Sequence, residues 1–181
     1  ASSTKSELKG TLPGFTASGT FEGGRTAKTL QSYSRIISLD YDKLEDVATV
    51  LKTIKDLTTT RAAFISPSGK GVKVFIEVDT EAKDHKKAWG AVKASYDLLI
   101  GIESDEQVND IPRLCYMSHD PDAYYNSSSS VFSVNECIKS STNQTNQLDW
   151  IANLTSNYQT FTEGSRNSYV FQYACISNRR G

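Results

Sequence analysis

The sequence has few of the residues that build zinc sites or disulfide frameworks. Its three cysteines, Cys115, Cys137 and Cys175, lack C-x-x-C spacing, and the 181 residues include only two histidines. A structural zinc site is therefore not expected. An odd number of cysteines without a disulfide pattern fits a reducing compartment, so we expect a cytoplasmic protein.

Long apolar runs and an excess of positive charge are also absent. No hydrophobic run approaches the roughly 20 residues of a membrane helix, so no membrane partner is expected. The 20 Lys and Arg residues balance 21 Asp and Glu, which argues against a pervasively basic surface for nucleic acid. A local basic groove beside an acidic site remains compatible with these totals. Hydrophobic residues, at 38 %, are sufficient for a globular core.

Composition divides the chain into four parts. Residues 1–33 are rich in Ser, Thr and Gly and predict an irregular N-terminal arm, with a short edge strand near Gly19–Phe21. Residues 34–134 form the folded core. The polar stretch 135–146 predicts a linker. Two helical patterns in residues 147–181 predict a helical tail, which we expect to be the start of a further region.

The core alternates strand patterns with two amphipathic helical patterns. Their order is that of the split βαβ, ferredoxin-like arrangement, in which helices cover one face of a mostly antiparallel sheet. The predicted fold class is therefore α+β, RRM-like, with the other sheet face free for a substrate. The expected elements are strand 34–39, helix 43–57, strand 61–65, strand 72–78, helix 81–100 and strand 113–118.

Two aspartates one residue apart, Asp40 and Asp42, end the first expected strand. Alternate side chains of a strand point to the same face, so both carboxylates should project together. Two like charges so close are unfavourable unless a cation or strong donors neutralise them, and carboxylate oxygens suit Mg²⁺ or Mn²⁺. The pair therefore predicts phosphoryl or nucleotidyl transfer. Two solvated acids that open a turn are the simpler alternative.

The glycine-rich turn after the second expected strand has features of a phosphate-binding loop. Glycine lets the backbone turn sharply and approach a ligand closely. Hydroxyl groups, backbone N–H groups and lysine charges can bind phosphate oxygens. A hairpin turn that contains two lysines without a ligand is the alternative. The candidate nucleotide-binding residues of this segment are Ser66, Ser68, Gly69, Lys70, Gly71 and Lys73.

A second acidic cluster precedes the last expected strand. It supplies Asp105 and Asp110 as candidates for a third metal carboxylate. Arg113, at the start of the strand, could bind a phosphate through two parallel hydrogen bonds. In the alternative interpretation both aspartates are loop acids, and one of them pairs with Arg113.

The order of these three motifs resembles that of the archaeo-eukaryotic primase (primase-polymerase) superfamily. The similarity is greater to the VirE N-terminal domain family, which is found in bacteria, often on mobile elements and ahead of a helicase-like module. It covers about residues 15–135. The stretches that carry it are Ile37–Asp42, Phe64–Lys73 and Arg113–Pro121, with Tyr125 and Asn126.

The resemblance implies a role for each acidic candidate. Asp40 and Asp42 match the first two metal carboxylates of the primase motif. Asp105 matches the third, because its distance from Arg113 is close to the spacing in the family, and Asp110 is the second choice. The implied cofactor is Mg²⁺ or Mn²⁺.

The resemblance also implies how the nucleotide is held. Ser68, Gly69 and Gly71 match the turn that contacts the triphosphate, and Arg113 matches a basic residue near the nucleotide. Active primase-polymerases usually have a histidine where this chain has Lys73. Lysine can bind phosphate as a point charge, but its geometry and hydration differ.

The expected function is a primase-polymerase-like nucleotidyltransferase domain in bacterial cytoplasm, with DNA and nucleoside triphosphates as partners. It would serve the replication or mobilisation of a mobile element, and a helicase-like module in the same or a neighbouring chain is a candidate partner. Two alternatives stay open. One is a degenerate module that binds single-stranded DNA or nucleotide without catalysis, as Lys73 suggests. The other is a two-metal nuclease that uses the same carboxylates.

Overall fold

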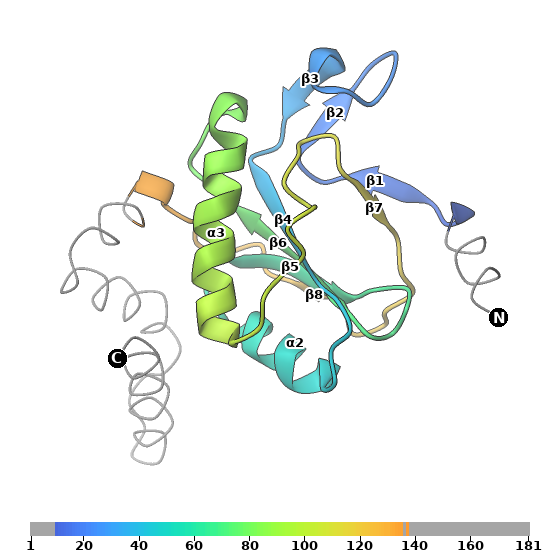
Figure 1. The fold of residues 1–181 in the computed structure, drawn as a ribbon, viewed down its shortest axis with the longest axis vertical. Coiled ribbons are helices and arrows are strands. Elements are labelled where there is room, and N and C mark those ends of the chain that lie inside the picture. The colour runs from blue at the N-terminus through green and yellow to red at the C-terminus, as the bar shows by residue number, and fades with distance from the viewer. Residues whose placement is uncertain (1–9, 136, 138–181) are drawn as a thin grey trace.

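The structure is a computed structural model that describes residues 10–135 and residue 137 (Figure 1). The described part combines antiparallel sheets with a small number of helices, so the predicted α+β class is confirmed. The expected helical tail at 147–181 lies outside the described residues. So does the expected linker at 135–146, apart from its residues 135 and 137.

A four-stranded antiparallel sheet forms the centre of the described region. The expected strands 34–39, 61–65 and 72–78 are confirmed as three of its members. The sequence did not predict the fourth, a two-residue edge strand. In spatial order the strands are β4 (Ile36–Tyr41), β6 (Val72–Glu77), β5 (Thr60–Ile65) and β8 (Tyr124–Tyr125).

Two helices cover one face of this sheet, with α2 packed on β5 and β6 and α3 packed on β4 (Figure 1). The first, α2 (Val47–Asp56), begins after Asp46, whose carboxylate accepts a hydrogen bond of 2.9 Å from the backbone N–H of Thr49. The second, α3 (His85–Ile100), continues the short 3-10 helix η2 (Ala82–Asp84). Both predicted helices are thereby confirmed.

Strand alternation separates a buried face from an open face of the central sheet. The side chains that point toward the helices are almost completely buried. Most of their neighbours along each strand point to the opposite face and are partly exposed, but Phe75, which lies against Phe15 and Phe64, is only 6 % exposed. The core residues of β4 and β6 are Ile37, Leu39, Tyr41, Val72, Val74 and Ile76. The open face carries Ser38, Asp40, Lys73 and Phe75.

The segment predicted as an irregular arm contains three short strands. One of them, β2 (Gly19–Phe21), confirms the expected edge strand and pairs with β3 (Leu30–Tyr33). The third, β1 (Gly14–Thr16), pairs with β7 (Leu114–Tyr116).

The pairing of β7 departs from the ferredoxin-like arrangement. In that arrangement the last strand lies beside the first, but here β7 pairs with β1 in a separate two-stranded sheet, and β8 adds to β5 instead. The reason is that the N-terminal segment supplies β7 with backbone partners. For example, the N–H of Met117 donates to the carbonyl of Pro13 at 2.9 Å.

Two cysteines fall in the described region. Cys115 and Cys137 are free thiols and both are buried. Burial raises the pKa of the Cys137 thiol. None of the helices formed by the described residues is both long enough and apolar enough to cross a membrane.

Candidate functional site

A cavity of about 210 Å³ lies between the open face of β4 and β6 and the strand β7. All three aspartates predicted to bind metal, Asp40, Asp42 and Asp105, line it. Two of the predicted phosphate-binding residues, Lys73 and Arg113, line it as well. The complete lining consists of Ser38, Leu39, Asp40, Asp42, Lys73, Phe75, Asp105, Val108, Arg113, Leu114, Cys115 and Tyr116.

The pairing of β4 with β6 places Asp40 directly opposite Lys73. Their side chains form an ion pair in which Lys73 Nζ donates to Asp40 Oδ2. The two side chains are only 14 % and 13 % exposed, so water screens this pair weakly. Lys73 thus contacts the first of the carboxylates that were predicted to bind metal.

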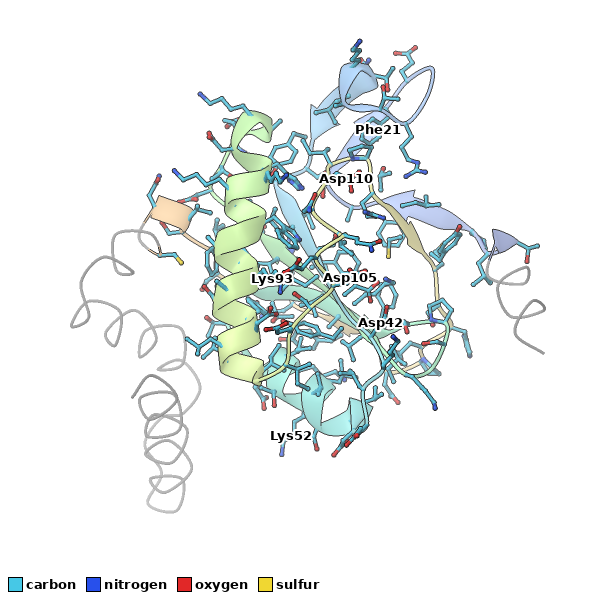
Figure 2. All side chains as sticks on the ribbon, in the orientation of Figure 1. Phe21, Asp42, Lys52, Lys93, Asp105 and Asp110 are labelled. Carbon is cyan, nitrogen blue, oxygen red and sulfur yellow. The ribbon has the colours of Figure 1, made fainter. Side chains whose placement is uncertain are left out.

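The connection from α3 to β7 brings Asp105 to the cavity. The backbone N–H of Asp105 donates to the carbonyl of Asp40 at 2.8 Å, which joins this connection to β4. Its carboxylate accepts a hydrogen bond of 2.9 Å from the N–H of Gln107. Asp105 lies near the centre of the view in Figure 2, whereas Asp110, from the same connection, lies closer to Phe21 of β2.

Arg113 is held by the same connection. Its Nε donates to Asp110 Oδ1 at 3.0 Å, and its guanidinium also donates to the carbonyl of Gln107. Asp110 is therefore an ion-pair partner of Arg113 and is not among the residues that line the cavity. Of the two candidates for a third carboxylate, only Asp105 lines it.

A mostly buried carboxylate that the sequence interpretation missed holds this connection in place. Asp97 Oδ1 accepts hydrogen bonds from the Tyr41 hydroxyl at 2.9 Å and from the backbone N–H of Ser104 at 3.1 Å. Lys93, one helical turn earlier, forms an ion pair with Oδ2. Burial and the negative charge of Asp97 raise the pKa of Tyr41, so the phenol stays protonated and donates. The signal in the sequence was the i, i+4 spacing of Lys93 and Asp97.

The predicted phosphate-binding turn between β5 and β6 lies outside the cavity lining. Its polar groups bond to one another. The hydroxyls of Ser66 and Ser68 are 2.9 Å apart, Gly69 N–H donates to the Ser66 carbonyl at 2.9 Å, and Lys70 N–H donates to Ser68 Oγ at 3.2 Å. The structure therefore brings Lys73 and Arg113 to the cavity, but not Ser66, Ser68, Gly69, Lys70 or Gly71.

The turn packs against the site at Gly71, where the neighbouring atoms leave no room for a side chain. A Cβ at this position would lie 2.7 Å from both Asp42 Oδ1 and the Tyr41 carbonyl, and 2.9 Å from Ser66 Oγ. Gly71→Ala is therefore expected to displace Asp42 and to lower the free energy of unfolding by about 1–3 kcal/mol. Urea unfolding measures the loss, and Mn²⁺ titration measures the effect on the site.

Gly69→Ala is the matched control. Gly69 has a left-handed φ of 71°, but a Cβ there meets no atom within 4 Å. Its substitution should cost about 1 kcal/mol through backbone strain and leave Asp42 in place. Equal Mn²⁺ affinity in the two variants would show that Gly71 does not shape the site.

The donors that line the cavity fit a hard divalent cation in chemical type, because all three are carboxylates. Within the described residues, however, no three His, Cys, Asp or Glu side chains are close enough together to hold a metal ion. Asp40 would have to exchange Lys73 for the cation. A cation at this site would therefore compete with an ion pair that the protein already contains.

The comparisons with known proteins give a family. Residues 7–125 match the model of a family described as BT4734-like, N-terminal domain, and this range contains every residue that lines the cavity. It is a different family from the VirE N-terminal domain family, so the expected membership in that family is wrong. Three short motifs in order did not suffice to distinguish the two. No curated protein and no solved structure matches the chain.

Proposed function

The chain belongs to the family described as BT4734-like, N-terminal domain, and we propose that its cavity is the site of a metal-dependent nucleotidyl transfer to DNA, the chemistry of a primase-polymerase. One observation carries this proposal: Asp40, Asp42 and Asp105 line a single cavity together with Lys73 and Arg113. Carboxylates favour a divalent cation, and the two basic side chains favour phosphate oxygens. The sequence places these residues on three segments far apart in the chain, and the fold unites them.

Each residue has a distinct part in the proposed reaction. Asp40, Asp42 and Asp105 are not close enough together in this structure to share an ion, so they would have to converge to hold Mg²⁺ or Mn²⁺. The ion would then neutralise the charge that develops on the transferred phosphate. Lys73 would release Asp40 and bind the phosphate oxygens of the nucleotide. Arg113, whose guanidinium is already fixed by Asp110, would bind a second phosphate. In a primase-polymerase-type core, helices would cover one face of the central sheet and the substrate would bind on the other.

A second candidate function is binding of nucleotide or single-stranded DNA without catalysis. The ion pair between Asp40 and Lys73 favours it, because both side chains are mostly removed from water and neutralise each other without a metal. In that case Arg113 would bind phosphate, and the only role of Asp40 would be its ion pair with Lys73.

Primer synthesis with Mn²⁺ and labelled nucleotides tests the proposal. Asp42→Asn and Asp105→Asn are expected to reduce product formation about a hundredfold, because each removes a ligand whose metal supplies several kcal/mol of charge stabilisation. Both side chains belong to exposed residues, so the variants should fold. Asp40→Asn is a poorer test, since it leaves the charge of Lys73 mostly buried and unpaired.

Glu106→Gln is the matched control, because it removes the charge of an exposed acid of the same connection that does not line the cavity. It should retain most of the activity. Absence of product from the wild-type protein, with measurable DNA binding, would overturn the enzyme and leave the binding module. Shortening of labelled DNA instead of its extension would show that the carboxylates serve a nuclease.

A further inference from the structure

Tyr125 is an aromatic side chain that the fold presents to solvent. It is 67 % exposed, more than Met117 at 52 % or Phe15 at 37 %. Its strand β8 pairs with β5, with Tyr125 opposite Ala62. Alternation along β8 turns Tyr124 toward the core, where it packs against the buried cluster, and turns Tyr125 to the open face.

The guanidinium group of Arg61 lies over the ring of Tyr125 and is itself held in place. The guanidinium carbon of Arg61 lies 5.5 Å from the ring centroid of Tyr125, a cation–π distance. Arg61 also donates to the carbonyl of Ser127 at 2.7 Å and lies 4.0 Å from the carboxylate of Glu77. With three partners the guanidinium is oriented before any ligand arrives, which reduces the entropy lost on binding.

The same face leads from Tyr125 to the cavity. In the register of the sheet, Tyr125 lies opposite Ala62, Ala62 opposite Phe75, and Phe75 opposite Ser38. Phe75 and Ser38 line the cavity. Phe75 is only 6 % exposed because the rings of Phe64 and Phe15 lie against it, with centroids 5.6 and 5.8 Å away, so a strand on this face would pass over these rings. Two strand spacings, roughly 10 Å, separate Tyr125 from Phe75 along the row. About three stacked nucleotides at 3.4 Å each would span that distance.

We propose that Tyr125, backed by Arg61, is a platform on which a base of single-stranded nucleic acid stacks, while the strand continues toward the cavity. The choice of ligand rests on the proposed function. Stacking requires a base freed from a duplex, and aromatic side chains beside arginine bind such bases with little sequence preference. A protein partner would need a contiguous apolar patch. Arg61 lies over the ring, the small Ala62 lies opposite Tyr125 in the sheet, and the polar Asn126 follows it in the chain.

Fluorescence anisotropy of a short labelled oligothymidylate tests the platform in the full chain. Tyr125→Ala is expected to weaken binding roughly tenfold, because one stacked base is lost. Tyr125→Phe keeps the ring and should bind as the wild type does. An abasic oligonucleotide of the same length should bind the wild type and Tyr125→Ala equally. Thermal unfolding checks that the substitutions leave this exposed position folded.

The outcomes separate the platform from the proposed catalysis. Weakened binding by Tyr125→Ala, with no primer synthesis by the wild type, supports the platform and overturns the catalysis. Normal binding by Tyr125→Ala, with active primer synthesis, overturns the platform alone. A wild-type protein that does not bind the oligonucleotide also overturns it. So does self-association in sedimentation velocity that Tyr125→Ala abolishes without an effect on the oligonucleotide, because the ring then serves a protein contact.

Discussion

Replacing Asp97 with alanine is expected to lower the free energy of unfolding by about 3–5 kcal/mol, which is the usual loss when one partner of a buried ion pair is removed. The Asp97 and Lys93 side chains are only 13 % and 15 % exposed. Alanine would leave the Lys93 ammonium, the Tyr41 hydroxyl and the Ser104 N–H without their acceptor. Urea unfolding, followed through the fluorescence of the buried Trp89, measures the change.

Two variants isolate the cause. Asp97→Asn keeps an oxygen that can accept from Tyr41 and Ser104 but removes the charge that faces Lys93, so it should lose clearly less stability than Asp97→Ala. Glu103→Ala removes an exposed acid beside Ser104 and should change stability by no more than about 0.5 kcal/mol. A loss below about 1 kcal/mol for Asp97→Ala would show that this carboxylate does not hold the connection in place.

Acidification is expected to destabilise the fold through His85. Burial lowers the pKa of His85 from 6.5 to about 4, against a smaller opposing effect of the Asp110 charge. The side chain is 4 % exposed, and its Nδ1 lies 2.9 Å from the Tyr33 hydroxyl. Between pH 6.5 and 4 the unfolded chain binds a proton that the folded chain excludes. Stability present above pH 6.5 is therefore lost as the pH falls, by about 3 kcal/mol in total.

The measurement is the free energy of unfolding in urea from pH 7.5 down to pH 5, where most carboxylates remain ionised. His85→Gln removes the titrating group and should flatten the curve between pH 6.5 and 5. His119→Gln replaces the other histidine of the chain, which is exposed, and should keep the slope of the wild type. Identical slopes in all three proteins would assign the pH dependence to groups other than His85.

Local patterns predicted most of the central elements. The alternation from Val72 to Glu77 identified β6, and the helical spacing of Trp89, Val92 and Tyr96 identified the buried side of α3, because each pattern is set by near neighbours in the chain. The two-residue strand β8 is too short to carry such a pattern. The pairing of β1 with β7 joins residues about a hundred positions apart, and no periodicity encodes that choice of partner.

Five of the ten candidate site residues line the cavity, and the contacts that they make were not predicted. Asp40 and Asp42 were chosen for their chemistry and Asp105 for its spacing from Arg113, and all three line one cavity. The ion pair between Asp40 and Lys73 depends on the register of β4 against β6, which the sequence left unspecified because the two strands are separated by a helix and a third strand. The role of Asp97 was not predicted for a similar reason, because its partners Tyr41 and Ser104 belong to other segments of the chain.

The pairing of β1 with β7 has a consequence for shortened forms of this chain. Phe15 of β1 lies against Phe75, with ring centroids 5.8 Å apart, while the backbone of β1 occupies the edge of β7. Deletion of the first sixteen residues would uncover an aromatic ring and a row of unpaired peptide groups at the same place. Exposed strand edges recruit strands from other molecules. We therefore expect β1 to protect the chain from aggregation. A protein that lacks the first sixteen residues should precipitate more readily than the longer chain.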